Sequence, residues 1–474
     1  MTSRMGRIRS IHFVGIGGAG MAGIAEVLIN LGYQVQGSDL KLGATTARLA
    51  RLGAVIHEGH DAQHLGDTDV VVVSSAVAKD NPEIVAAQAR RIPVVKRAQM
   101  LAELMRFRYG IAVAGTHGKT TTTSLIASVL AEAGLDPTFV IGGRLASAGA
   151  NARLGAGEYL VAEADESDAS FLHLQPMIAV VTNIDADHLG AYGGDLGRLK
   201  QGFLGFLHNL PFYGLAVLCR DDANTRELIP ELGRRVVSYG FDEAADVRVV
   251  ATERHGLQTQ FSVRLREDPQ PLHFRLNLPG AHNVLNALAA LAVAGELKIE
   301  PAAVRAAFAK FSGIDRRLQV LGSVRTAVGM VTFVDDYGHH PTEIAATLAA
   351  ARDAWPGRRI VVVFQPHRYS RTRELLDDFA QVLARVDALL LTHVYAAGEE
   401  PLSGADGKAL ARAVRARAAV EPIFVEDLAQ LPTVLANVVK ADDVVLTLGA
   451  GSIGAVAASL PEALAVRGPV GVKA

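Results

Sequence analysis

The sequence has 474 residues, of which 50% are hydrophobic and 20% are charged, and its formal net charge is -2. This composition excludes a disordered chain, which is poor in apolar residues, and the balanced charge argues against a protein that coats nucleic acid. Domains contain about 100 to 200 residues, so the length predicts about three domains, each able to bury a core. We expect a well-packed globular protein with no nucleic-acid partner.

A single cysteine, Cys219, lies in an apolar segment, so no intrachain disulfide is possible and a reducing compartment is expected. We interpret it as a buried structural thiol. The first ten residues lead into a short apolar run followed by glycines, which is not the pattern of a signal peptide. No run of about 18 apolar residues occurs, which excludes a membrane-spanning helix by length. The sequence therefore predicts a cytoplasmic protein with no membrane partner.

The first hundred residues alternate short β-branched runs with helical stretches, which is typical of a small parallel α/β domain. Strands are predicted at 11–15, 33–39, 70–76 and 92–95. A basic helical stretch follows, and a new strand begins at residue 109. We place the first domain at residues 1–107 and expect it to be Rossmann-like.

Two further α/β domains follow. The second, at residues 108–313, has predicted strands at 109–115, 158–164, 177–183 and 214–220, and closely spaced alternating segments at 245–278. That spacing favours an added antiparallel β segment. The third, at residues 314–474, has predicted strands at 330–336, 359–365, 388–394 and 443–452 and is expected to be Rossmann-like.

The strongest motif is GTHGKTTTT, residues 115–123, between a predicted strand and a predicted helix. Backbone N–H groups and the helix dipole hold phosphate at such a turn, Lys119 reaches the β- and γ-phosphate oxygens, and Thr120 can bind Mg²⁺. The spacing is shorter than in a strict phosphate loop, because Val113 stands where the first glycine is expected. A glycine-rich turn with a chance lysine is the alternative.

Acidic groups follow two more predicted strands. Glu163 begins the motif EADESDASF, and Asp185, Asp187 and His188 lie in VTNIDADHL. Carboxylate oxygens with one imidazole suit Mg²⁺ that bridges nucleotide and substrate phosphoryl oxygens. A solvated loop would explain any one of these groups alone, but the preceding phosphate loop favours function for Glu163 and His188.

The segment GIGGAGMAG, residues 15–23, contains a G-x-G-x-x-G pattern after a strand, with Asp39 at the end of the next strand. This pattern is typical of dinucleotide binding, and an NAD(P) dehydrogenase domain is the alternative that it raises. A phosphate loop in the same chain favours a nucleotide-sugar ligand instead.

Polar groups of the later segments are also candidates. Asn283 and Asn286 are spaced to share one helix face, where they either read adenine or cap the helix. Arg317 is placed to stabilise phosphoryl charge, with a plain surface arginine as the alternative. Arg368 and Arg371 are three residues apart beyond a strand and suit a carboxylate. His340 precedes a proline and either acts in the site or starts a helix.

Taken in order, these motifs together with HNLPFYG, DDYGHHPTE and FQPHRYSRT resemble the alanine-adding branch of the Mur ligase family from end to end. The shortened G-T-x-G-K-T loop is characteristic of ligases that add amino acids to muramyl peptides and folates. The resemblance implies ATP-dependent ligation of L-alanine to the lactoyl carboxylate of UDP-N-acetylmuramate, through an acyl phosphate, in peptidoglycan synthesis. It implies ATP and Mg²⁺ as cofactors, and a monomer or homodimer.

The resemblance also implies roles for residues of this chain. The implied UDP-sugar site uses Gly17, Gly18, Ser38, Asp39, Ser74, Ser75 and Arg97. The implied ATP site uses Gly115, Thr116, His117, Gly118, Lys119, Thr120, Thr121, Asn283, Asn286 and Arg317. The implied metal ligands are Thr120, Glu163 and His188, and the implied alanine site uses Tyr337, His339, Arg368 and Arg371. The implied catalytic residues are Lys119, Glu163, His188, Arg317 and His339.

Two departures from the family pattern stand out. Gly190 occupies a position where the family often has an aspartate after the D-H pair. Residues 201–211 contain no lysine, so the carbamylated lysine of ligases that add later amino acids is not predicted.

Other functions remain open from the sequence. A ligase that attaches a whole peptide to UDP-muramate during wall recycling would share these motifs. A dinucleotide-dependent oxidoreductase explains residues 8–40 but not residues 109–372. A protein that senses UDP-sugars does not need Lys119, Glu163 and His188 together.

Overall fold

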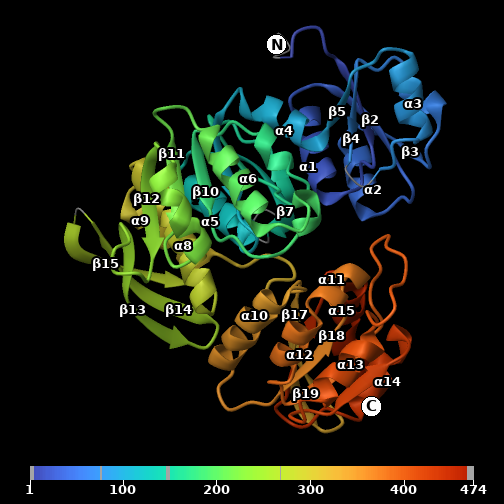
Figure 1. Ribbon diagram of the computed structural model, residues 1–474, viewed down its shortest axis with the longest axis vertical. Helices are drawn as coiled ribbons and strands as arrows, with labels where there is room; N and C mark the ends of the chain where they lie inside the picture. The colour runs from blue at the N-terminus through green and yellow to red at the C-terminus, as the bar shows by residue number, and fades with distance from the viewer. Residues whose placement is uncertain (1–4, 75–76, 146–149, 267, 467–474) are drawn as a thin grey trace, which may run out of the picture. The chain divides into compact units, whose positions relative to one another are not determined.

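The computed structural model describes residues 5–74, 77–145, 150–266 and 268–466. The chain divides into two compact units. The first runs up to Glu253 and includes Gln260–Asn277 and His282–Ser312; the second consists of Arg254–Thr259, Leu278–Ala281 and the chain from Gly313 onward. Three sheets of five, ten and six strands organise these units within the described residues. Figure 1 shows how their strands and helices follow one another along the chain. The predicted α/β fold is confirmed.

The five-stranded sheet has the order β3-β2-β1-β4-β5, and all its pairs are parallel. Its strands are β1 (Ser10–Val14), β2 (Gln34–Asp39), β3 (Val55–Glu58), β4 (Val70–Val73) and β5 (Val94–Lys96). Its helices are α1 (Ala19–Asn30), α2 (Ala44–Arg51), α3 (Pro82–Ala89) and α4 (Arg97–Met105). The strand order places the C-terminal ends of β3, β2 and β1 side by side.

The ten-stranded sheet has the order β15-β14-β13-β12-β11-β10-β6-β9-β7-β8. Its strands are β6 (Tyr109–Ala114), β7 (Thr138–Leu145), β8 (Ala150–Arg153), β9 (Tyr159–Glu163), β10 (Ile178–Val181), β11 (Leu215–Cys219), β12 (Arg235–Gly240), β13 (Val247–His255), β14 (Gln258–Leu265) and β15 (Asp268–Leu276). The helices that follow these strands are α5 (Lys119–Glu132), α6 (Leu196–His208), α7 (Ala223–Leu228), α8 (Ala281–Glu296) and α9 (Pro301–Lys310).

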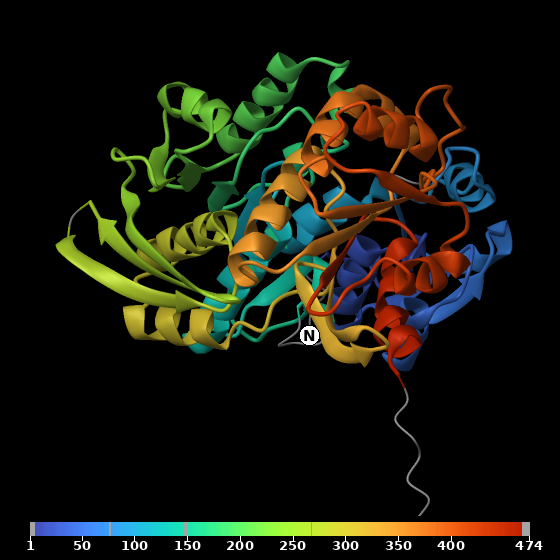
Figure 2. The same ribbon diagram turned by 90° about the horizontal axis from the view of Figure 1, so that it is seen from below.

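The predicted antiparallel addition is the extended segment β13–β15 (Figure 2). Gly256 and Leu257 alone join β13 to β14. A connection of two residues makes these neighbours antiparallel, because parallel strands need a crossover of about a dozen residues or more.

The N-terminal glycine-rich segment also serves packing within the first unit. A Cβ atom on Gly23 would lie 3.1 Å from Ala152 Cβ and 3.3 Å from Val140 Cγ1. A glycine therefore lets α1 lie close against β7 and β8. One continuous hydrophobic cluster runs from Ile11 in β1 to Phe206 in α6.

The six-stranded sheet has the order β16-β17-β21-β18-β19-β20, antiparallel between β16 and β17 and parallel elsewhere. Its strands are β16 (Gln319–Thr326), β17 (Gly329–Asp336), β18 (Ile360–Phe364), β19 (Ala388–Thr392), β20 (Pro422–Val425) and β21 (Val444–Leu448). Its helices are α10 (Pro341–Ala354), α11 (Tyr369–Glu374), α12 (Leu376–Leu383), α13 (Gly407–Arg415), α14 (Leu431–Ala436) and α15 (Ile453–Leu464).

Both faces of this sheet are covered. Val362 and Phe364 of β18 belong to one buried cluster, whereas Val361 and Val363 belong to another. Side chains alternate between the two faces along a strand, so each face has its own core. This explains why the sequence shows an unbroken apolar run there.

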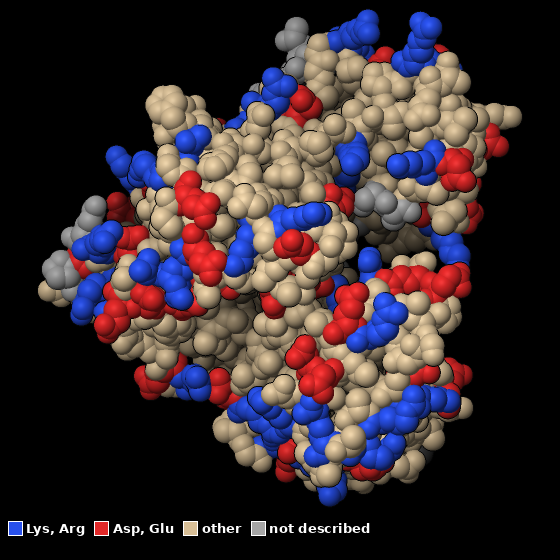
Figure 3. Space-filling model, viewed as in Figure 1, with Lys and Arg blue, Asp and Glu red and all other residues tan. Residues whose placement is uncertain are grey.

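No helix in the described part of the chain is long and apolar enough to cross a membrane. On the face shown in Figure 3, basic and acidic side chains are interspersed.

Cys219 is 2% exposed at the end of β11, and burial raises the pKa of its thiol to about 12. An unperturbed thiol has a pKa of about 8.5, so the reactive thiolate at pH 8 should be on the order of a thousandfold rarer in the native protein. We expect alkylation by iodoacetamide to be very slow until the chain is unfolded in denaturant. Cys219→Ser supplies the blank, and rapid uptake of one equivalent by the native protein would contradict the buried thiol.

Candidate active site

A cavity of about 430 Å³ lies at the C-terminal ends of β1 and β2 in the five-stranded sheet. Its lining residues are Gly15, Gly17, Gly18, Asp39, Leu40, Lys41, Gly43, Ala44, Thr45, Thr46, His60, Ser74 and Val77. The N-cap of α1 is Gly18, which has no side chain to cap the first N–H groups of the helix. The first N–H groups of α1 therefore suit a phosphate ligand.

The glycine-rich loop is held by the end of β2. Ser38 O accepts hydrogen bonds from Gly15 N at 2.9 Å and Ile16 N at 3.0 Å. The Gly17 N–H donates to Asp39 Oδ2 at 2.8 Å, and a Cβ on Gly17 would lie 2.8 Å from the same oxygen. The fingerprint thus depends on direct contact between the loop and Asp39.

The predicted UDP-sugar residues occupy different places around this cavity. Gly17, Gly18, Asp39 and Ser74 line it, whereas Ser38 is fully buried. Arg97 lies beside Gly20, and its Nη2 pairs with Asp165 Oδ2 at 3.1 Å.

Ser75 lies outside the described residues. His60 lines the cavity and was not predicted; no sequence motif marks it.

In the central sheet, the phosphate loop between β6 and α5 is fastened to the segment that follows β10. The N–H groups of Thr116 and His117 donate to Asn183 O and Asn183 Oδ1 at 3.0 and 2.8 Å. Thr182 Oγ1 and Asn183 Nδ2 both donate to His117 O, at 2.6 and 3.0 Å. Thr182 and Asn183 were not predicted as site residues; they hold the phosphate loop in place.

His117 and Thr116 make further bonds to the same segment. The ring Nε2 of His117 lies 3.0 Å from Asp185 Oδ2, and Thr116 Oγ1 accepts the Asp185 N–H at 2.9 Å. Asp185 therefore helps to fix the predicted ATP-binding loop.

Two glycines are required by this geometry. Gly115 has φ +129° and Gly118 has φ +84°, both in the region that favours glycine. A Cβ on Gly115 would overlap Thr182 Oγ1, at 2.0 Å, and one on Gly118 would lie 2.6 Å from Asn286 Oδ1.

Lys119 is the first residue of α5, and its ammonium group is fully engaged. Lys119 Nζ donates to Gly115 O at 2.5 Å, to Thr116 O at 3.2 Å and to both carboxylate oxygens of Glu166 at 2.9 Å. Burial by itself lowers the pKa of Lys119, but the carboxylates of Glu166, Asp165 and Glu163 together outweigh burial, so this pKa is raised and the ammonium stays charged. Glu166, 1% exposed, was not predicted.

The predicted metal ligands follow three neighbouring parallel strands, β10, β6 and β9. Thr120 is in the first turn of α5, Glu163 ends β9, and His188 follows β10. Glu163 Oε1 accepts the Gly142 N–H at 2.7 Å, and His188 has a left-handed backbone, φ +56°. A hydroxyl, a carboxylate and an imidazole thus occur at the sheet edge where α/β proteins bind ligands.

Asn283 and Asn286 are buried in α8, 7% and 6% exposed. Asn286 Oδ1 accepts a hydrogen bond from Thr122 Oγ1 at 3.1 Å, and its Nδ2 donates to Asn283 Oδ1 at 3.2 Å. The structure therefore brings both amides beneath the start of α5. Thr121, also predicted at the ATP site, is buried in the same turn.

The second unit gathers rings and charges after β17 and β18. The Tyr337 ring lies 5.5 Å from the His339 ring, which lies 5.5 Å from the His367 ring. Arg317 Cζ lies 5.5 Å above the Tyr337 ring, and Arg371 Nη1 lies 3.4 Å from His367 Nδ1. Four predicted residues therefore meet in one cluster.

Glu343 and His367 complete this cluster and were missed. Glu343 Oε2 lies 3.2 Å from His339 Nδ1, and its Oε1 lies 3.6 Å from Arg317 Nη1. Burial, with His339 and the two nearby arginines, lowers the pKa of His367 to about 4. His367 is thus neutral near pH 7. His340 is the N-cap of α10, which confirms the helix-start interpretation.

The two predicted carboxylate-binding arginines differ. Arg371 is 6% exposed, whereas the Arg368 side chain is 47% exposed and its Nη1 lies 4.0 Å from Glu399 Oε1. Arg368 also has φ +70°. Arg371 is therefore the better fixed of the pair.

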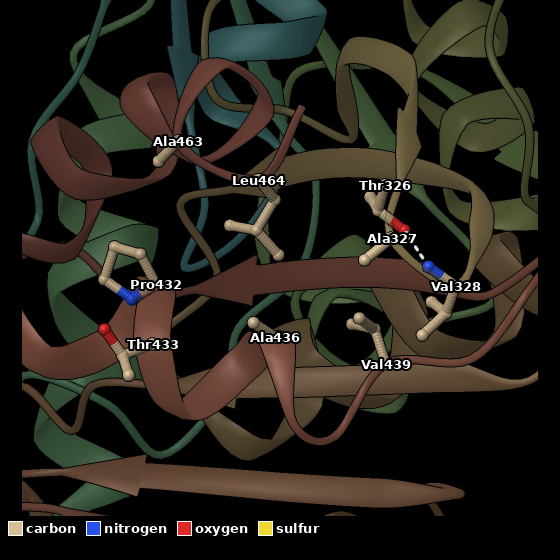
Figure 4. Close-up of a pocket in the computed structure, with 9 residues that line it drawn as sticks. All are labelled: Thr326, Ala327, Val328, Pro432, Thr433, Ala436, Val439, Ala463 and Leu464. Atoms are coloured by element: carbon tan, nitrogen blue, oxygen red, sulfur yellow. Dashed lines mark hydrogen bonds between the residues drawn. The ribbon is translucent and has the colours of Figure 1, made fainter. Parts of the chain in front are cut away.

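A second cavity, about 330 Å³, lies among β16, α14 and α15 of the second unit (Figure 4). Its described lining is Thr326, Ala327, Val328, Pro432, Thr433, Ala436, Val439, Ala463 and Leu464. These residues carry no charge and no titratable group, so the chemistry lies elsewhere.

A phosphate loop at a helix N-terminus, a charged lysine and a glycine-rich cavity in the same unit define a nucleotide-dependent enzyme of the α/β class. Family models match most of the chain: the Mur ligase family catalytic domain at residues 10–109, the Mur ligase middle domain at 113–294 and the Mur ligase glutamate ligase domain at 316–451. The chain belongs to the Mur ligase family.

Individual relatives agree with this assignment. The UDP-N-acetylmuramate–L-alanine ligase of Methylococcus capsulatus is 63% identical over 463 residues, 98% of each chain. The enzyme of the same name from Halorhodospira halophila is 63% identical over 466 residues, 98% of this chain and 96% of that one.

Among solved structures, a UDP-N-acetylmuramate–alanine ligase from Thermotoga maritima superposes with TM-score 0.80 at 32% identity, covering 96% of this chain and 99% of that one. A murein peptide ligase from Psychrobacter arcticus gives TM-score 0.72 at 26% identity, covering 98% and 100%.

Gly118→Ala should damage the phosphate loop, because alanine at φ +84° costs about 1–3 kcal/mol and its Cβ would meet Asn286. We expect a lower melting temperature and weaker ADP binding by calorimetry. Gly295→Ala is the matched control, since a Cβ there meets nothing within 4 Å. Unchanged ADP affinity in Gly118→Ala would contradict the described loop.

Proposed function

We propose that this chain is an ATP-dependent ligase that joins L-alanine to the lactoyl carboxylate of UDP-N-acetylmuramate. The products are UDP-N-acetylmuramoyl-L-alanine, ADP and phosphate, and the reaction belongs to peptidoglycan precursor synthesis. The observation that carries the proposal is Lys119 at the start of α5, in a loop braced by Thr182 and Asn183. The two relatives at 63% identity bear the name of this ligase, which supports alanine as the amine.

The first unit supplies the phosphoryl chemistry in this proposal. The free N–H groups at the start of α5 and the Lys119 ammonium bind the β- and γ-phosphates. Thr120, Glu163 and His188 would hold Mg²⁺, which supplies charge neutralisation at the transferred phosphoryl group. The lactoyl carboxylate attacks the γ-phosphorus, the bond to ADP breaks, and an acyl phosphate forms.

The second unit supplies the amine in this proposal. Arg371 and Arg368 bind the alanine carboxylate, and Tyr337 and His339 lie beside them. The alanine nitrogen attacks the acyl carbonyl, phosphate leaves, and the nitrogen loses a proton. We assign His339 as the base that accepts this proton and Arg317 to neutralisation of phosphoryl charge.

In this proposal residues 1–107 bind the UDP-sugar, residues 108–313 bind ATP, and residues 314–474 bind the amino acid. Asn283 and Asn286 belong to the ATP site in it, and Gly17, Gly18, Asp39, Ser74 and Arg97 to the UDP-sugar site. We also propose that the protein is cytoplasmic and that it is a monomer or a homodimer.

A second candidate is peptide attachment to UDP-muramate, because the Psychrobacter arcticus structure named a murein peptide ligase also covers 98% of this chain. The deciding assay measures ADP release with ATP, Mg²⁺ and UDP-N-acetylmuramate, comparing L-alanine, the tripeptide and no amine. We expect release with L-alanine. ADP release with the tripeptide alone would favour peptide attachment. No ADP release in any of the three reactions would contradict both candidate functions.

Lys119→Ala should lower kcat/KM for ADP release about 100- to 1,000-fold, because it removes a charge that stabilises the transferred phosphoryl group. Lys200→Ala is the control, since Lys200 of α6 pairs through its Nζ with Glu227 Oε2 of α7 at 2.7 Å. Equal loss in both variants would show that Lys119 has no special role.

Arg371→Lys should raise KM for L-alanine about tenfold or more, because lysine cannot form the two parallel bonds that arginine makes to a carboxylate. KM for ATP should stay the same. Arg373→Lys, an exposed position of the same helix, serves as the control. An unchanged KM for alanine in Arg371→Lys would remove Arg371 from the amino-acid site.

A further inference from the structure

A buried carboxylate lies beneath the N-terminal cavity. Glu83, in the first turn of α3, is fully buried. Its Oε2 accepts a hydrogen bond from Ser38 Oγ at 2.5 Å and lies 3.0 Å from His60 Nδ1. Its Oε1 lies 3.2 Å from His64 Nδ1 and 3.3 Å from the buried His12 Nε2. One carboxylate thus joins residues from β1, the end of β2 and the loop after β3.

This carboxylate is charged. Burial raises the pKa of Glu83, but hydrogen bonds to His12, Ser38 and His60 and the charge of His12 outweigh burial and lower it to about 2. The position in the first turn of α3 adds the favourable end of the helix dipole, and Glu83 N donates to Asn81 Oδ1 at 3.0 Å.

An ionised carboxylate accepts hydrogen bonds and cannot donate them. His60 Nδ1 lies 3.0 Å from Glu83 Oε2 and 2.9 Å from Ser38 Oγ. Because the Ser38 hydroxyl donates its only proton to Glu83 Oε2, both neighbours of Nδ1 are acceptors, which places the His60 proton on Nδ1. The lone pair of the neutral ring is then on Nε2. His60 lines the cavity, so Nε2 is the ring nitrogen left to serve a ligand there as an acceptor.

The sheet order indicates which part of a nucleotide meets His60. Phosphate belongs at the N-terminus of α1, after β1, and a ribose hydroxyl at the end of β2. His60 follows β3, the next strand outward in the order β3-β2-β1. The base end of the nucleotide therefore lies toward His60.

We propose that Glu83 is a positioning residue that holds His60 with Nε2 as an acceptor for the uracil N3–H, and so makes the cavity selective for uridine over cytidine nucleotides. This inference rests on the proposed function for its UDP-sugar ligand. Cytosine has an unprotonated N3, so two lone pairs would face each other. A site built to accept a donor rejects the analogue that lacks it.

The first test is the tautomer of His60 in the ligand-free full-length protein. ¹⁵N NMR of histidine-labelled protein, with His60 assigned through His60→Gln, should show the Nδ1–H form. Glu83→Gln should shift His60 away from that form, a change that a merely structural role for Glu83 would not produce. An Nε2–H ring in the unmodified protein would overturn the proposal, and this result does not depend on whether Glu83→Gln folds.

The second test measures UDP and CDP affinity by calorimetry. The unmodified protein should prefer UDP by about tenfold or more, and Glu83→Gln and His60→Gln should bring the ratio toward one. ADP affinity should stay the same in all three proteins, which controls for general damage. The proposal would be overturned if the variants preferred UDP over CDP by the same factor as the unmodified protein.

The outcomes separate this inference from the proposed function. Selective UDP binding without ADP release in the ligase assay would contradict the proposed function and leave the role of Glu83 standing. Normal alanine-dependent ADP release with no preference for UDP over CDP would contradict the role of Glu83 alone.

Discussion

The bracing of the phosphate loop by the segment after β10 is the constraint on which the central site depends. Asn183 accepts the N–H groups of Thr116 and His117, so these two groups are already used. The phosphate-binding donors that remain are those at the start of α5, where a helix leaves its first N–H groups unsatisfied. The brace therefore fixes both the path of the loop and the direction from which phosphate is bound.

The glycine-rich loop at the N-terminal cavity is also held by bonds to the end of a neighbouring strand, but through different groups. There the glycine-rich loop is bonded to Ser38 O and to the Asp39 carboxylate at the end of the neighbouring strand, β2. A loop bonded to the adjacent strand end needs glycine where a Cβ would strike that strand, as at Gly17 and Gly115. Glu83 extends the arrangement one layer deeper, because it accepts a hydrogen bond from the Ser38 hydroxyl, and the main-chain carbonyl of the same residue holds the loop.

Motifs at strand ends were predictable because loop chemistry is local in sequence. The phosphate loop and the Tyr337–His339 segment were predicted from such short motifs. The central strands β6, β10, β18 and β21 were predicted from their apolar runs. The strands without a clear sequence signal include β3, β8, β16 and β20, each of which is the edge strand of its sheet. Glu166, Glu83 and His367 were missed because their partners are distant in sequence, and only the fold brings a buried carboxylate to Lys119 or to His60.

The Lys119–Glu166 pair limits what a nucleotide gains at this loop. Lys119 already donates to two backbone carbonyls and to Glu166, which accounts for the three donors of an ammonium group. A phosphate oxygen must therefore share or replace one of these acceptors. Because Glu166 is buried, separating the pair leaves a carboxylate with little water around it, which costs free energy. The free energy gained when phosphate meets Lys119 is thus the difference between two ion pairs, and the N–H groups at the start of α5 must supply much of the affinity.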